Sequence, residues 1–156
     1  MALLKLGYRS IVLVDSDKLI DQKVIAAHEQ AGGKHVQWEP GRATEHELFI
    51  SLDDEGVAAL INRAIEIHGK ERIGSHISHY SKNTTNLDAV QFEKIDAGFQ
   101  EVTRKLLGDA AHEGGWFKTQ SHFEELTRDI VAPRLDKAHE AFRERVKRLF
   151  GWAHEH

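Results

Sequence analysis

The sequence predicts an α/β protein in which a partial parallel sheet is followed by a mostly helical carboxyl-terminal region. Two observations predict the sheet: the run IVLV at residues 11–14 and the segment KHVQWE at residues 34–39 are both typical of strands. Residues 18–33, between them, have the pattern of a helix, which makes a βαβ unit with parallel pairing and a right-handed crossover. Apolar residues at helical spacing from residue 57 onward predict the helical region.

Each element of the predicted βαβ unit has its own sequence pattern. The continuous apolar and β-branched run at residues 11–14 indicates a strand that is covered on both faces. We expect Leu19, Val24 and Ala27 to face inward from the helix, which the glycine pair at residues 32–33 would end. The second strand, over residues 34–39, is less apolar.

Helical periodicity then recurs through the rest of the chain. We expect one helix around residues 57–68, another over residues 87–107, and more helix near the carboxyl terminus. Pro133 is expected to begin the final helix, as a proline in the first helical position. The polar segment 74–86 and the glycine-rich segment 108–119 are expected to be loops.

Composition narrows the class of protein. The chain has 156 residues, a net charge of −4 and no cysteine. Disulfides and cysteine-based zinc sites are therefore excluded, and a cytoplasmic location is expected. No apolar run approaches the roughly 20 residues that cross a bilayer, so we expect no membrane association. A modest negative charge gives no general basic signature for nucleic acid, although a local basic groove can bind it on an acidic protein.

Two carboxylates follow the first predicted strand. Asp15 and Asp17 stand one residue apart, where the carboxyl end of a parallel strand commonly meets a ligand. Close carboxylates repel each other unless a cation lies between them, and Mg²⁺ is well suited to that position. The alternative is that Asp17 caps the following helix and Asp15 is a solvated loop acid, and the spacing alone leaves both interpretations open.

Two further charged residues are candidates for the same site. Glu45 follows the second strand, at the same predicted edge of the sheet, although it also stands where a helix would begin. Lys118 lies in the segment GGWFKT at residues 114–119. It is either an exposed lysine beside a packed Trp116–Phe117 pair or a cation that neutralises charge on a phosphate.

These pieces in this order resemble one family. GYRSIVLVDSDK, GGKHVQWEPGRATEHELF and WFKT are similar to the carboxyl-terminal part of the Toprim domain of OLD-family (overcoming lysogenization defect) nucleases, especially the class 2 type. The resemblance implies Mg²⁺- or Mn²⁺-dependent cleavage of phosphodiester bonds in DNA, with RNA as the alternative substrate. It implies that Asp15, Asp17 and Glu45 are metal ligands and that Lys118 is the catalytic lysine.

The resemblance also implies a domain organisation. Residues 1–156 would form a single Toprim-like domain, with the βαβ part and its acidic site at 1–52, a helical insertion at 53–110, and the lysine-bearing segment and last helices at 111–156. The family's first Toprim strand, which ends in a glutamate, and its preceding ATPase domain are expected to be absent. We therefore expect an ATPase, or a chain that carries the missing amino-terminal half, as a partner.

A sheet of only two strands suggests that the chain associates with further copies of itself. Two strands and a final helix with an apolar stripe leave apolar surface uncovered. We expect a homo-oligomer, formed through the sheet edge or through residues 133–150.

Three other functions remain open at this stage. A haloacid-dehalogenase-like phosphatase also has a D-x-D motif, and Asp53 and Asp54 would supply its later acids, but Leu19 stands where its motif has Thr or Val. A metal-dependent nucleotide-sugar transferase would need an upstream nucleotide-binding strand. A non-catalytic α/β interaction module would use the same acids as helix caps.

The histidines suggest no separate site. His76 and His79 are three residues apart in SHISHYS, which makes zinc conceivable. With no cysteine and no obvious third ligand, we expect them to lie in a solvated polar loop.

Overall fold

The computed structural model describes residues 6–154 and divides the chain into two compact units. Unit 1 contains the residues up to Ala43 and those from Glu140 onward, whereas unit 2 is the continuous segment Thr44–His139. The protein is mostly helical, 67%, with a two-strand parallel sheet near the amino terminus, which confirms the expected fold class. Each unit is described by itself below.

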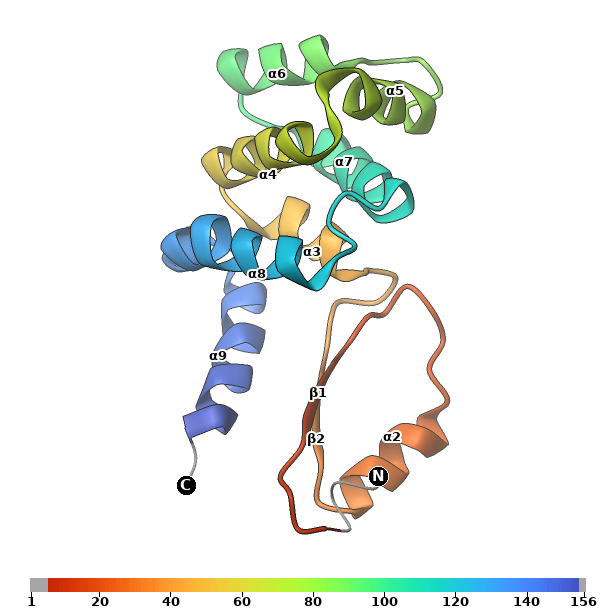
Figure 1. The fold of residues 1–156 in the computed structure, drawn as a ribbon, viewed down its shortest axis with the longest axis vertical. Helices are drawn as coiled ribbons and strands as arrows, with labels where there is room; N and C mark the ends of the chain where they lie inside the picture. Colours follow the sequence, from red (N-terminus) through yellow and green to blue (C-terminus); the bar gives the residue numbers. More distant parts are fainter. Residues whose placement is uncertain (1–5, 155–156) are drawn as a thin grey trace. The chain divides into compact units, whose positions relative to one another are not determined.

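The sheet of unit 1 consists of β1 (Ile11–Val14) and β2 (Lys34–Gln37), joined by α2 (Gln22–Gln30) (Figure 1). The strands are parallel, with Ile11 opposite Lys34 and Val14 opposite Gln37. The predicted βαβ unit and its parallel pairing are therefore confirmed.

Two details of this unit were predicted wrongly. Val12 and Leu13 are 40% and 43% exposed, so β1 is not covered on both faces. Leu19 and Val24 are exposed rather than inward-facing. Leu19 precedes α2, because the side chain of Asp21 caps that helix by accepting a hydrogen bond from the Lys23 N–H. Two short strands also offer α2 little surface to cover.

The last helix, α9 (Glu140–His154), completes unit 1. The rings of Trp38 and Phe142 stack with centroids 5.5 Å apart. Arg145 donates from Nε to the Gln37 carbonyl at 2.8 Å and from Nη2 to the Glu39 carboxylate at 2.5 Å. The helix is thereby attached to β2 and to the loop that follows it.

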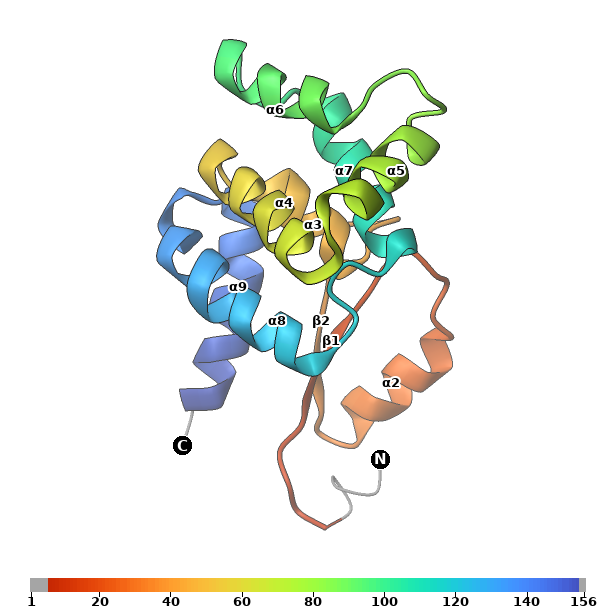
Figure 2. The ribbon, with the colours of Figure 1, turned by 45° about the horizontal axis from the view of Figure 1, so that its top comes forward.

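The regular secondary structure of unit 2 is entirely helical over the described residues. Its elements are α3 (Thr44–Ser51), α4 (Asp54–His68), α5 (Lys70–Tyr80), α6 (Leu87–Asp96), α7 (Glu101–Gly114), α8 (Gln120–Leu126), the π-helical turn η1 (Thr127–Val131) and the 3₁₀ turn η2 (Ala132–Lys137) (Figure 2).

The core of unit 2 forms where these helices meet. Phe49, Leu60, Ile73, Leu107 and Trp116 are fully buried there. They come from α3, α4, α5, α7 and the segment after α7.

The close packing of α3 against α7 depends on a glycine. A Cβ at Gly108 would lie 3.0 Å from the Cα of His46. Any larger residue at position 108 would therefore push α3 away from α7.

Four expectations for unit 2 were wrong. Residues 108–114, expected to be part of a loop, belong to α7, because Ala110 and Ala111 are fully buried on the same helix as Leu107. Residues 74–80 are helical, because Ile73 and Ile77 are one turn apart and both fully buried. The expected helix over residues 87–107 is two helices, divided near Gly98, whose φ is +77°. Pro133 begins η2 rather than the final helix, which starts at Glu140.

Candidate functional site

The D-x-D carboxylates lie in the loop directly after β1. Asp15 is exposed and Asp17 is half-buried. Ser16, between them, connects this loop to the loop after β2 through three hydrogen bonds. Its N–H donates to the Arg42 carbonyl at 2.8 Å, its Oγ donates to the Trp38 carbonyl at 2.7 Å, and its carbonyl accepts from the Gly41 N–H at 3.0 Å. The two carboxylates therefore flank Ser16, a residue whose backbone and side chain are held by hydrogen bonds.

Capping of α2 does not account for either acid. The residue that caps α2 is Asp21, whose carboxylate accepts from the Lys23 N–H at 2.9 Å. The alternative in which Asp17 caps the next helix is therefore wrong. Asp15 and Asp17 belong to a strand-end loop, which is a common position for a ligand in a parallel sheet.

Glu45 lies in the first turn of α3 and is 8% exposed. Its Oε2 is 3.3 Å from Nδ1 of His112 on α7. A second pair lies beside the first: Nε2 of His46 is 3.1 Å from Oδ1 of Asp109, and the two imidazole rings are 5.2 Å apart. Both pairs join α3 to α7, and neither was predicted, because their members are more than sixty residues apart in the sequence.

Lys118 is exposed, in the short segment between α7 and α8. Trp116 and Phe117 before it are fully buried, and they fix the backbone from which the lysine projects. Gly115 turns the chain with a φ of +63°, which favours glycine. A Cβ at Gly115 would lie 2.6 Å from Cε of Lys118, so the lysine side chain occupies the space that this glycine leaves.

The expectation that His76 and His79 lie in a solvated loop is wrong, because both lie in α5. His76 and His68 hold the other side of this turn. Trp116 donates from Nε1 to Nδ1 of His76 at 3.0 Å, and its carbonyl lies 2.9 Å from Nε2 of His68. Burial, followed by the nearby charges of Arg72, His68 and His79, lowers the pKa of His76. A neutral His76 can accept the indole hydrogen bond, whereas a protonated one cannot.

The four predicted site residues fall in different units. Asp15 and Asp17 belong to unit 1, whereas Glu45 and Lys118 belong to unit 2. Their assembly into one site therefore stays a prediction. Within either unit, the described residues contain no cluster of three or more His, Asp or Glu side chains that could hold a metal ion.

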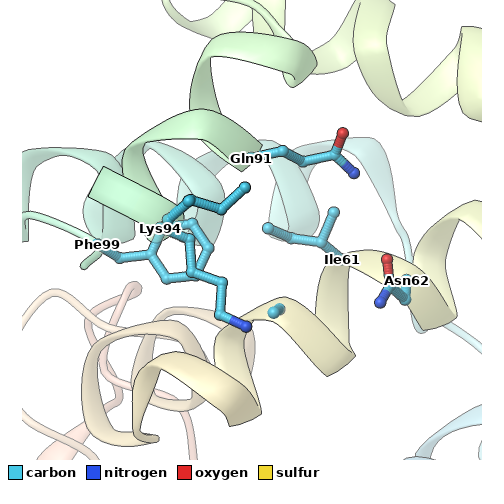
Figure 3. A pocket seen from close by; sticks show the side chains of 7 residues that line it. Ile61, Asn62, Gln91, Lys94 and Phe99 are labelled. Carbon is cyan, nitrogen blue, oxygen red and sulfur yellow. The ribbon is translucent and has the colours of Figure 1, made fainter. Parts of the chain in front are cut away.

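A separate pocket of about 340 Å³ lies between α4 and α6 (Figure 3). Ile61 and Phe99 line its apolar part, and the amides of Asn62 and Gln91 supply polar groups. Lys94 also lines it, but its Nζ is 2.8 Å from the Glu55 carboxylate. The predicted site residues do not line this pocket.

Comparison with known proteins identifies no relative. No protein-family model matches the chain, no curated protein matches it, and no solved structure matches it. Over residues 6–154, no helix has the length and apolar character needed to span a membrane.

Proposed function

We propose that this chain binds Mg²⁺ or Mn²⁺ through Asp15 and Asp17 and takes part in metal-dependent cleavage of phosphodiester bonds in nucleic acid, as the OLD-family Toprim nucleases that it resembles do. The observation that best supports this proposal is the loop after β1. Two carboxylates flank the fixed residue Ser16 at the carboxyl end of a parallel strand, and neither caps α2, the helix that follows them.

The donor chemistry of the loop fits a hard divalent cation. Carboxylate oxygens are the ligands that Mg²⁺ prefers, and one or two of them suffice when water and phosphate complete the shell. Glu45 is the proposed third ligand. It is three residues from Arg42, so covalent geometry limits the Cα atoms of Glu45 and Arg42 to about 11 Å apart. The Arg42 carbonyl in turn accepts the Ser16 N–H. His112 would orient the Glu45 carboxylate, as residues behind metal ligands commonly do.

Lys118 is the proposed catalytic lysine. The ions supply activated water and stabilisation of the leaving oxygen in reactions of this class. The lysine would neutralise charge that develops on the phosphate. Its backbone is suited to that role, because the buried Trp116 and Phe117 and the turn at Gly115 hold it in place while the ammonium group stays exposed.

Metal binding is the decisive test. Calorimetric titration with Mn²⁺ is expected to show binding that Asp15→Ala weakens strongly, because the variant loses a carboxylate ligand. Asp21→Ala is the matched control: it removes an acid from the same segment, but one that caps α2. Equal Mn²⁺ affinity in the parent and in Asp15→Ala would refute the metal site.

Cleavage tests the chemistry. Supercoiled plasmid with Mn²⁺ is expected to be nicked faster once a fragment with the family's first Toprim strand is added, because the glutamate of that strand would complete the metal site. Lys118→Ala should then lower the rate about a hundred-fold or more, whereas Lys105→Ala, another exposed lysine of unit 2, should not. Equal nicking by the complemented parent and Lys118→Ala proteins would show that Lys118 is only a surface residue.

The haloacid-dehalogenase alternative has less support. Its later acids would be Asp53 and Asp54, but Asp53 caps α4 by accepting from the Gly56 N–H at 2.8 Å. Asp54 accepts from Arg104 and from the Phe99 N–H. Both acids thus have structural partners. Hydrolysis of small phosphate esters in preference to DNA would favour the phosphatase, and absence of metal binding would favour an interaction module.

A further inference from the structure

The two edges of the small sheet in unit 1 differ. The Ser10 carbonyl accepts from the Lys34 N–H and the Val14 carbonyl accepts from the Trp38 N–H, so the even-numbered residues of β1 face β2. Alternate residues of a strand direct their backbone groups to opposite sides, and Ile11 and Leu13 therefore direct theirs away from β2. In the part of the chain that the structure describes, no strand pairs with that edge.

The outer edge of β2, by contrast, is covered. Its Gln37 carbonyl accepts from Arg145 of α9. Edge strands that do not pair with another chain usually carry a charged residue, a proline or a β-bulge. The open edge belongs to the sequence Ile-Val-Leu-Val, which has none of these, and Val12 and Leu13 are both well exposed.

We propose that this edge pairs with β1 of a second copy of the chain. The two β1 strands would be antiparallel, and the four strands would form one continuous sheet with the β1 strands in the centre. A two-fold axis through Val12 places Ile11 of each copy opposite Leu13 of the other. Both residues direct their N–H and C=O groups outward, so each such pair exchanges two hydrogen bonds.

Charge selects this register over its neighbours. With the axis at Val12, Arg9 of each copy lies opposite Asp15 of the other, which gives two oppositely charged pairs at the ends of the strands. An axis at Leu13 would instead place Asp15 opposite the apolar Ile11, and it would place Arg9 opposite Asp17, which lies in the bend beyond the strand. Opposite charges across strands stabilise pairing, and like charges oppose it.

Arg9 is held in place for this contact. Its guanidinium lies over the Trp152 ring, 4.8 Å from the centroid, and donates to the Trp152 carbonyl. A guanidinium has five N–H donors, so it can hold a carbonyl and a carboxylate together. Arg9, Leu13 and Asp15 share one face of the strand, since side chains alternate.

The test is a charge exchange measured by sedimentation equilibrium. Arg9→Glu and Asp15→Arg each replace two attractive pairs by two repulsive ones, so each should raise the dissociation constant of the dimer about ten-fold or more. The double variant Arg9→Glu/Asp15→Arg should restore dimerisation, whereas Arg9→Glu/Asp17→Arg should not. Lys18→Glu changes the net charge as much as Arg9→Glu does, and should leave the constant unchanged.

Hydrogen exchange supplies an independent measurement. The amides of Ile11 and Leu13 should gain protection as the protein concentration rises, while the Trp38 amide, which donates to Val14 within one copy, should be protected at every concentration. Circular dichroism establishes that each variant is folded. All measurements use EDTA, because Asp15 is also a proposed metal ligand; the interface and the proposed nuclease function can thus fail separately.

Two outcomes would overturn the proposal. One is a parent protein that stays monomeric at millimolar concentration. The other is a dimer in which Ile11 and Leu13 gain no protection or in which the charge exchange restores nothing. Such a dimer would form through another surface.

Discussion

The adjacent glycines at the end of α7 should respond very differently to alanine. Gly114 is the last residue of the helix, and a Cβ there would lie 2.4 Å from Nδ1 of His76 and 2.9 Å from Nε1 of Trp116. These are the two atoms that the 3.0 Å hydrogen bond joins. Trp116 is 0% exposed, so its ring has no solvent into which it could move. Gly114→Ala must therefore break the hydrogen bond or displace the core.

The energies can be compared term by term. A buried indole N–H that loses its acceptor costs about 1–3 kcal/mol. Overpacking of a dense core costs about 1–3 kcal/mol more. The better helix propensity of alanine returns at most about 1 kcal/mol. We therefore expect Gly114→Ala to lower the free energy of unfolding by about 3 kcal/mol.

Gly115→Ala should cost less. The left-handed backbone at Gly115, with φ at +63°, costs an alanine about 1–2 kcal/mol. The new Cβ would meet the end of the Lys118 side chain, which is exposed and can move. The expected loss is thus about 1–2 kcal/mol, less than that for Gly114→Ala.

Urea unfolding followed by far-UV circular dichroism measures both variants. Gly151→Ala is the matched control, because Gly151 is a helical glycine whose added Cβ would meet no atom within 4 Å, and it should be neutral or slightly stabilising. A Gly115→Ala loss equal to or larger than that of Gly114→Ala would refute the reasoning. A Gly114→Ala protein within about 0.5 kcal/mol of the parent would refute it too.

Three further changes have defined outcomes. Burial and neighbouring cations lower the pKa of His76 in the folded protein, so its contribution to stability is complete above about pH 6.5 and is lost as the pH falls through the folded pKa. His76→Gln should therefore make the free energy of unfolding fall less steeply below pH 6.5. An unchanged pH dependence in His76→Gln would contradict this assignment. Arg104→Ala should cost about 2–4 kcal/mol in urea unfolding, because Arg104 donates to the carbonyls of Phe49 and Leu52; a loss under about 1 kcal/mol would contradict this. Ser16→Ala should cost about 1 kcal/mol and speed amide exchange in the loop after β2, and unchanged exchange there would show that Ser16 does not hold the two loops together.

The elements with strong local patterns were predictable. The apolar run of β1 predicted its bounds, and the recurrence of Val57, Leu60, Ile61 and Ala64 predicted α4. Residues 74–80 were missed because polar residues surround Ile73 and Ile77, and only burial against other helices reveals this apolar pair. The break at Gly98 was missed for a related reason. The exposed Ile95 and Val102 continue an apolar pattern that does not follow the core.

Some features of the candidate site were also predictable from local sequence, and others were not. The position of Asp15 and Asp17 at a strand end follows from local sequence alone. The Ser16 hydrogen bonds to Trp38 and Arg42 do not, because they depend on how two loops meet. The contact of Trp116 with His76 joins residues forty positions apart, and no spacing rule signals it.

The discontinuity of unit 1 has a consequence for how the protein is made. Thr44–His139 is one uninterrupted stretch, so it can acquire its structure as soon as it leaves the ribosome. The sheet is synthesised before unit 2, but its support is complete only with α9, which supplies Phe142 to stack on Trp38 and Arg145 to hold the edge of β2. During that interval β2 lacks the helix that covers its outer edge. A segment translated after unit 2 thus completes the support of a sheet translated before it.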